Sequence, residues 1–328
     1  MTKADVLMTT PMTPYVIAGL ERAFNLRKLW EAPDPEAAIA SLAPSLTLMA
    51  AGVGHAPVTG AFMDRFPKLE IISSMGVGYD HIDAAYAGAH GIVVTHTPGV
   101  LDEEVADTAM ALLLNTVRRL PQAERYLRAG GWLTRPFPLT ATLHGRTMGI
   151  LGLGRIGQAI AARAQAFGLK VAYHNRHPKP DQPFAYFPTL IGLAQACDIL
   201  MVAAPGGEST RRIVDAAVLA ALGPDGVLIN IGRGSVVDDD ALIDALAHGR
   251  ILAAGLDVFT DEPRVPQALL NFDNVVLLPH VASATHFTRD AMGQLVIDNL
   301  VAWSEGRGAL TPVPETATMT ASGRAGCA

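Results

Sequence analysis

The last third of the chain contains three polar side chains of types that could together reduce a keto acid: Arg233, Glu262 and His280. Each follows an apolar run of the kind that forms a buried strand. A guanidinium can hold a carboxylate and polarise a carbonyl, and an imidazole can give a proton to the carbonyl oxygen as hydride reaches the carbon. A carboxylate beside the imidazole would orient it and keep it protonated. One such residue alone is more often structural, but three after successive strands indicate a reductase.

A candidate site for the hydride donor lies in the stretch from Thr147 to Gly168. An apolar run leads into Gly152-x-Gly154-x-x-Gly157, and a helical pattern follows at once. Gly152 would make the turn, Gly154 would let the backbone approach a pyrophosphate, and Gly157 would let helix and strand pack closely. The helix N-terminus would offer N–H groups to the phosphates. The alternative is a tight turn in another α/β sheet, but the complete strand–turn–helix context favours dinucleotide binding.

The residues after the second strand of this region, 170–174, bear on which dinucleotide binds. An NAD site usually places an acidic residue there for the ribose 2′-hydroxyl, and this chain has none. Arg176 would bind a 2′-phosphate through its planar fork, and Asn175 and Lys179 would add hydrogen bonds or charge. We therefore predict NADP(H) as the cofactor, with NAD(H) less favoured. The alternative is a solvated basic turn.

The elements that must position these residues form two sets. Residues 147–278 alternate six apolar runs with helical patterns, which predicts a doubly wound parallel sheet that binds ligands at the carboxyl ends of its strands. Residues 1–98 show the same alternation without a G-x-G-x-x-G turn, which predicts a second parallel sheet with another role. A helical pattern over 102–120 could link the two, and the irregular segment 129–146 after it carries Trp132 and Phe137.

The composition excludes several classes of protein. A net charge of -6 over 328 residues gives no basic footprint for nucleic acid. No apolar run approaches the roughly 20 residues of a membrane span, and the N-terminus lacks a signal-peptide pattern. Cys197 and Cys327 are best interpreted as unpaired thiols in a reducing compartment, so we expect a cytoplasmic protein. We expect no metal site.

A second substrate contact is possible in the stretch from Met75 to Asp80, Met-Gly-Val-Gly-Tyr-Asp, which follows a predicted strand. Small residues there would expose backbone N–H groups that can hold a carboxylate. The other interpretation is an ordinary turn before a helix capped by Asp80. The residues alone leave both open.

Several short motifs, in a fixed order over most of residues 70–290, carry a family resemblance. The chain resembles the D-isomer-specific 2-hydroxyacid dehydrogenases, and within them the NADP-preferring glyoxylate/hydroxypyruvate reductases and hydroxyphenylpyruvate reductases. The motifs are Gly76-Val-Gly-Tyr-Asp-His-Ile-Asp83, Val105-Ala-Asp107, Pro136-Phe-Pro-Leu-Thr140, Gly152-Leu-Gly-Arg-Ile-Gly157, Asn230-Ile-Gly-Arg-Gly234, Gly255-Leu-Asp-Val-Phe259 with Glu262-Pro263, and Pro279-His-Val-Ala-Ser283.

The resemblance implies roles for individual residues. Arg233 would anchor the substrate, His280 would be the acid/base, and Glu262 would be its partner. Val77 and Gly78 would offer backbone N–H groups to the substrate carboxylate. It implies a homodimer with the 100–145 region at the interface, where Trp132 would reach a neighbouring active site. Further cofactor contacts would come from Arg155 and Ile156 at the pyrophosphate, Asp257 at the nicotinamide carboxamide, and Thr210 and Ile231.

Together these observations predict an α/β protein of two doubly wound parallel-sheet domains. A Rossmann NADP-binding domain, 99–287, is inserted into a flavodoxin-like substrate-binding domain, 1–98 with 288–314, and a cleft between them would close on the substrate. Residues 315–328 are predicted to be disordered.

The predicted reaction is NADPH-dependent reduction of a small 2-keto acid, glyoxylate or hydroxypyruvate, with His280 as proton donor. The D configuration of the 2-hydroxy acid product follows from the resemblance alone. One alternative is a same-family reductase for a bulkier acid, hydroxyphenylpyruvate or 2-ketogluconate. The other is a non-catalytic, dinucleotide-sensing scaffold that resembles a co-repressor, against which the presence of Arg233, Glu262 and His280 argues.

Overall fold

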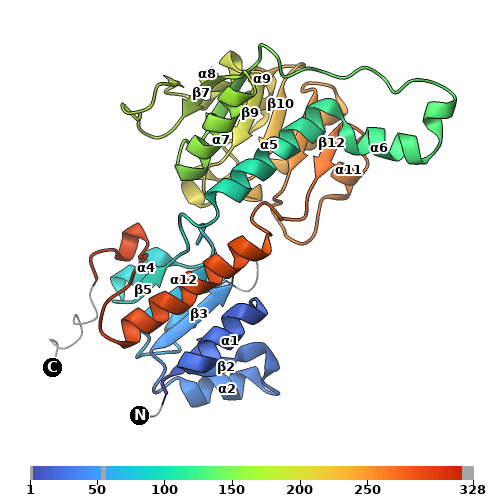
Figure 1. The fold of residues 1–328 in the computed structure, drawn as a ribbon. Coiled ribbons are helices and arrows are strands. Elements are labelled where there is room, and N and C mark those ends of the chain that lie inside the picture. The colour runs from blue at the N-terminus through green and yellow to red at the C-terminus, as the bar shows by residue number, and fades with distance from the viewer. Residues whose placement is uncertain (1–2, 53–56, 320–328) are drawn as a thin grey trace. The chain divides into compact units, whose positions relative to one another are not determined.

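The structure, a computed structural model, describes residues 3–52 and 57–319 (Figure 1). The chain divides into two compact units, one of Met1–Leu101 with Thr285–Ala328 and the other of Asp102–Ala284. Each unit is built on a wholly parallel sheet with helices, which confirms the predicted fold class.

The first unit contains a five-stranded sheet in the order β2-β1-β3-β4-β5. The strands are β1 (Asp5–Met8), β2 (Asn25–Lys28), β3 (Leu48–Gly52), β4 (Ile71–Met75) and β5 (Val93–Thr95). The helices are α1 (Pro14–Ala23), α2 (Pro35–Leu42), α3 (Gly60–Met63), α4 (Ala84–Ala89) and α12 (His286–Ser304), with short 3-10 turns at Leu29–Glu31 and Pro314–Thr316.

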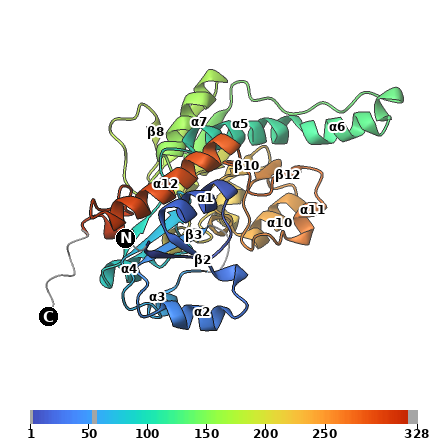
Figure 2. The same ribbon diagram turned by 60° about the horizontal axis from the view of Figure 1, so that its bottom comes forward.

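Successive strand side chains point to opposite faces, so an apolar strand can pack on both. One face of this sheet forms a buried cluster with α2, α3 and α4 that includes Leu7, Met49 and Ile72. The helices α1 and α12 pack together, and α12 lies against β4 (Figure 2). There the Ser73 hydroxyl donates to the Val296 carbonyl. The sheet is therefore completed by a helix from the far end of the chain.

The C-terminal residues return to the edge strand β5. The Val313 N–H donates to the Val94 carbonyl, and Thr316, which is fully buried, hydrogen-bonds both the N–H and the carbonyl of Val94. The prediction of disorder from residue 315 is wrong for 315–319, because Thr316 finds its partners on a strand 222 residues away. The predicted tail over 320–328 lies outside the described residues.

The second unit contains a seven-stranded sheet in the order β12-β11-β10-β9-β6-β7-β8. The strands are β6 (Thr147–Leu151), β7 (Lys170–His174), β8 (Ala185–Tyr186), β9 (Ile199–Val202), β10 (Val227–Asn230), β11 (Ala253–Leu256) and β12 (Val275–Leu277). Because β6 lies between β7 and β9, the strand order reverses beside it, which is where such sheets bind ligands.

Helices cover both faces of this sheet. They are α5 (Asp102–Arg118), α6 (Leu120–Arg128), α7 (Arg155–Ala166), α8 (Leu190–Ala196), α9 (Ala216–Leu222), α10 (Asp239–Ala247) and α11 (Gln267–Leu270). Short 3-10 turns lie at Gly131–Leu133, Glu208–Thr210 and Gly234–Val236. One buried cluster joins α8, α9 and α10 to the sheet, and α5 with α7 packs on the opposite face.

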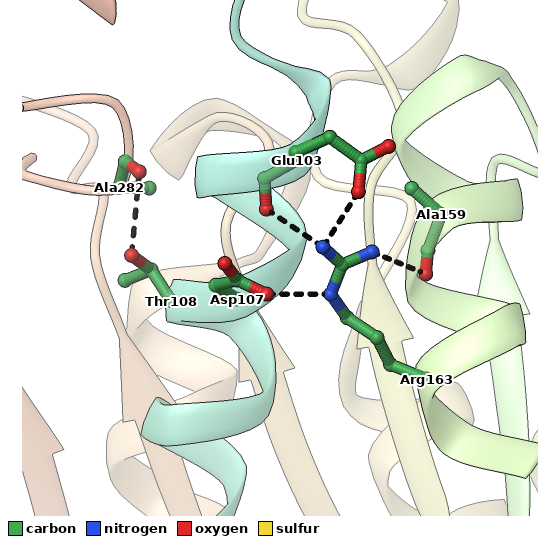
Figure 3. Close-up of polar contacts among 6 residues, drawn as sticks. All are labelled: Glu103, Asp107, Thr108, Ala159, Arg163 and Ala282. Carbon is green, nitrogen blue, oxygen red and sulfur yellow. Dashed lines mark hydrogen bonds and ion pairs between the residues drawn. The ribbon is translucent and has the colours of Figure 1, made fainter. Parts of the chain in front are cut away.

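The first two turns of α5 are hydrogen-bonded to α7 on one side and to Ala282 on the other. The Arg163 guanidinium on α7 donates to Asp107 Oδ1 and to Glu103 Oε2, each at 2.6 Å (Figure 3). On the other side of α5, the Thr108 hydroxyl donates to the Ala282 carbonyl at 3.3 Å. The Arg163 contacts join α5 to α7, and the Thr108 contact joins α5 to the segment just after His280.

Several elements have no counterpart in the sequence prediction, namely the charged edge strand β2, the short strand β8 and the helices α2, α6 and α11. The helix expected over 102–120 ends at Arg118, and the chain continues as the separate helix α6. Arg119 has φ 51° and ends α5, and Pro121 then lies in the first turn of α6, where a missing N–H costs nothing. No helix in the described ranges is long and apolar enough to cross a bilayer.

Candidate active site

His280 and Glu262 are brought together at the carboxyl ends of the second unit's strands. His280 Nδ1 lies 2.6 Å from Glu262 Oε2, and the other carboxylate oxygen accepts the Phe259 N–H at 2.9 Å. Burial acts to raise the pKa of Glu262, but these two hydrogen bonds and the charges of His280 and Arg233 outweigh it and lower the pKa. Glu262 is thus an ionised partner that holds one ring nitrogen of His280 and leaves Nε2 as the other proton-bearing position.

Asp257 shapes the backbone around His280. Its carboxylate is fully buried and accepts the N–H groups of Val281 and Ala282 at 2.8 and 2.9 Å. The His280 N–H donates to the Asp257 carbonyl, and His280 itself has φ 53°, an uncommon value for a residue with a side chain. Burial raises the pKa of Asp257, and the two backbone N–H groups oppose that rise. Asp257 therefore fixes the backbone at His280 and at the two residues that follow it.

Arg233 lies in a turn that follows β10. The buried Asn230 side chain closes this turn, since its Oδ1 accepts the Gly232 N–H and its Nδ2 donates to the Arg233 carbonyl. A Cβ on Gly232 would lie 2.5 Å from the Ala204 carbonyl oxygen, and one on Gly234 would overlap the Phe259 backbone. Both glycines therefore let the turn pack closely against other backbone.

The glycine-rich turn joins β6 to α7 as predicted. Gly152 has φ 97°, and a Cβ there would lie 2.7 Å from the Ala204 nitrogen. A Cβ on Gly157 would lie 2.4 Å from the Gly152 oxygen, which reflects the close helix–strand packing. A Cβ on Gly154, by contrast, would meet nothing within 4 Å. The open space is at the N-terminus of α7, where no side chain caps the N–H groups, so a pyrophosphate could bind there.

The segment after β7 is held by side chains that its own sequence does not reveal. The Tyr173 hydroxyl accepts the Lys179 N–H at 2.8 Å and donates to the Lys179 carbonyl at 3.3 Å. The Tyr186 hydroxyl donates to the Asn175 carbonyl at 3.2 Å. Asn175 Oδ1 accepts the Leu153 N–H at 2.7 Å, which ties this segment to the glycine-rich turn. The Arg176 side chain is exposed on the fixed backbone.

In the first unit, Val77 and Gly78 lie in the turn between β4 and α4. The helix is capped by Asp83, which accepts the Tyr86 N–H, and not by Asp80 as the alternative interpretation required. The Tyr79 hydroxyl donates to Glu315, and burial, with the Glu315 carboxylate, raises the pKa of Tyr79 to about 12. Val77 and Gly78 are half-buried in this turn.

The remaining predicted cofactor residues have varied surroundings. Arg155 is exposed, and its Nε donates to Asp102 at 2.8 Å. Ile156, the second residue of α7, is half-buried, and Ile231 is buried just after β10. The Thr210 hydroxyl donates to the Pro205 carbonyl at 2.7 Å. Within 3–52 and 57–319, no group of three or more His, Cys, Asp or Glu side chains could hold a metal ion.

Comparison with known proteins places this arrangement in a family. Residues 110–282 match the family described as D-isomer specific 2-hydroxyacid dehydrogenase, NAD binding domain. The chain is 47% identical over 313 residues to glyoxylate/hydroxypyruvate reductase A of Arabidopsis thaliana, covering 95% of this chain and 100% of that protein. It is 44% identical to hydroxyphenylpyruvate reductase of Plectranthus scutellarioides, with 95% and 100% covered.

A solved structure agrees with both the fold and the sequence match. The NADPH-dependent glyoxylate/hydroxypyruvate reductase of Sinorhizobium meliloti, in complex with NADP and malonate, superposes with a TM-score of 0.90 at 51% identity. The match covers 96% of this chain and 98% of that one. The resemblance drawn from the motifs is therefore confirmed, and the chain belongs to the D-isomer-specific 2-hydroxyacid dehydrogenase family.

Proposed function

We propose that this protein is an NADPH-dependent reductase that converts glyoxylate, hydroxypyruvate or a similar small 2-keto acid to the D-2-hydroxy acid. The observation that carries the proposal is the pair formed by His280 and Glu262, with Arg233 near enough for its charge to lower the pKa of Glu262. The relatives named for glyoxylate, hydroxypyruvate and NADPH support the substrate and cofactor.

The residues divide the chemistry among them. NADPH supplies the hydride when it is bound. Arg233 holds the substrate carboxylate and polarises the keto oxygen, and His280 gives its Nε2 proton to that oxygen as the carbon is reduced. The Glu262 carboxylate holds Nδ1 of His280 and so keeps the imidazole oriented. We infer that the backbone N–H groups of Val77 and Gly78 are further ligands of the substrate carboxylate.

The cofactor site is proposed on the second unit. Gly152, Gly154 and Gly157 with the start of α7 would hold the pyrophosphate, helped by Arg155 and Ile156. Arg176 would pair with the 2′-phosphate, and its exposed side chain has no acidic partner among the described residues. Asn175 Oδ1 accepts the Leu153 N–H, so this side chain joins the two loops beside the cofactor. Asp257 would hold the nicotinamide carboxamide, Thr210 and Ile231 would be further cofactor contacts, and Lys179 would add charge.

We further propose a homodimer that resides in the cytoplasm. The segment from α6 to residue 140, here called the 120–140 arm, exposes large apolar side chains, including Leu133 at 92% and Leu139 at 100% exposure. Such a surface usually meets another protein. A buried, unpaired Cys197 is in keeping with a reducing compartment.

A panel of 2-keto acids with purified protein tests the main proposal. With NADPH, glyoxylate or hydroxypyruvate should cause loss of absorbance at the reduced-cofactor band, and His280→Gln should slow turnover about 10²- to 10⁴-fold while NADPH still binds. Faster turnover with hydroxyphenylpyruvate would favour the bulkier-substrate alternative. Cofactor binding without turnover of any acid would overturn the proposal and favour the sensing scaffold.

A further inference from the structure

His96 lies in a different loop from Val77 and Gly78 but contacts the turn that those two residues form. It follows the edge strand β5, and its Nδ1 lies 2.9 Å from the Val77 carbonyl oxygen. A carbonyl oxygen can only accept, so Nδ1 must carry the proton and donate it. The ring is half-buried and packs edge-on against Tyr79, with 5.6 Å between ring centroids and an interplanar angle of 85°.

The position of His96 is itself fixed from the C-terminal segment. Its N–H donates to the Thr311 carbonyl at 3.1 Å, and the Thr311 hydroxyl donates back to the His96 carbonyl at 2.6 Å. The next residue, Thr97, donates its N–H to the Gly76 carbonyl at 2.9 Å. The imidazole is therefore a rigid donor aimed at one peptide group of the turn.

That peptide group joins Val77 to Gly78 and is in the ordinary trans form. In a trans peptide the carbonyl and the N–H lie in one plane and point in opposite directions. A hydrogen bond that holds the Val77 oxygen therefore also sets the direction of the Gly78 N–H. It polarises the same peptide as well, so that N–H becomes a stronger donor. A glycine on one side of the bond would otherwise let this peptide rotate easily.

We propose that His96 is a positioning residue for substrate binding, which aims the Gly78 N–H at the substrate carboxylate by holding the Val77 carbonyl. This inference rests on the proposed function, in which that N–H binds the carboxylate. The carboxylate is present in the keto acid and in the transition state alike. His96 therefore acts on substrate affinity and leaves the hydride step almost unchanged.

Three variants at one position test the proposal. In His96→Asn the amide nitrogen takes the place of Nδ1, and in His96→Leu a methyl group of similar shape takes that place without a proton to donate. His96→Gln, which moves the amide one bond outward, is a second, polar loss-of-donor variant should the leucine variant fold poorly. The KM for hydroxypyruvate, the KM for NADPH and kcat are measured for each.

We expect His96→Leu and His96→Gln to raise the keto-acid KM about tenfold, with kcat and the KM for NADPH within about threefold of the parent. His96→Asn should restore the keto-acid KM to within about threefold. Equal KM values in all three variants and the parent would overturn the inference, as would equal damage in the leucine and asparagine variants. If the parent reduces no keto acid, the proposed function fails first and this inference with it.

Discussion

Glu262 has both carboxylate oxygens occupied, one by the His280 ring and one by the Phe259 N–H. Burial acts to raise the pKa of Glu262, but these two hydrogen bonds lower it below its usual range, so the group is ionised at neutral pH. A carboxyl group whose pKa is lower in the folded protein stabilises the fold above its unfolded pKa, and that contribution is lost as the pH falls through the folded value. Near neutral pH the contribution of the Glu262 carboxylate to stability is therefore fully present.

Replacing Glu262 with glutamine should slow the reaction. The amide keeps the shape of the side chain but removes the negative charge that holds the His280 ring. We expect kcat/KM for keto-acid reduction to fall about tenfold or more, because the ring is no longer held in the orientation that it has in the parent. The KM for NADPH is the control and should change less than about twofold, and equal kcat/KM values in the parent and Glu262→Gln would show that Glu262 does not act on His280.

Individual residues differ in how far the sequence reveals them. Arg233, Glu262 and His280 could be proposed from the sequence because each has a reactive side chain in a loop that follows a strand. Asn230 and His96 could not be assigned from the sequence, since their importance lies in hydrogen bonds to turns that fold beside them. A buried polar residue at the end of an apolar strand, as Asn230 is, was the one available signal.

Among elements, the loop after β7 has a backbone geometry that residue spacing alone could not predict. Its basic residues predicted a 2′-phosphate site, but the backbone geometry depends on the Tyr173 hydroxyl, which is fully buried and binds Lys179 twice. The main helices and strands were predicted because their apolar periodicity records which face is buried. The strands β2 and β8 were missed, since edge strands carry charged or short segments that satisfy no such pattern.

Tyr173→Phe should weaken NADPH more than NADH. Without its hydroxyl, the Lys179 N–H loses a buried partner and the loop that presents Arg176 loosens. We expect the KM for NADPH to rise about three- to tenfold, and the KM for NADH, which has no 2′-phosphate, to change less than about twofold. The two cofactors serve as controls for each other in one protein. Equal increases for both would indicate general damage to the site and contradict this role.

At the scale of the whole molecule, the 120–140 arm leads away from the seven-stranded sheet in both views (Figures 1 and 2). Its side chains Trp132, Leu133 and Leu139 are exposed to solvent, so their apolar surface contributes no burial energy to the single chain. A second copy of the chain would bury them. The arm was expected at an interface from the family resemblance, and its exposed leucines give that expectation a physical basis.

A charge on the arm should therefore break the proposed dimer. The parent should sediment at about twice the chain mass of 34.5 kDa, and Leu133→Glu combined with Leu139→Glu should sediment as a single chain. Leu310→Glu, at an exposed leucine outside the arm, is the matched control and should leave the mass unchanged. A parent protein that sediments as one chain would refute the homodimer.

The first unit is assembled from both ends of the chain, and this has a consequence for its biosynthesis. Residues up to Leu101 are made first, but α12, which covers one face of their sheet, begins at His286. At about 5–20 residues per second, translation needs on the order of 10–40 s to cross that gap. The second unit is one continuous segment of the chain, so it can fold before α12 is made. Until then one face of the first unit's sheet has no helix packed on it. A nascent chain of this protein therefore presents its N-terminal sheet residues to chaperones until the last helix leaves the ribosome.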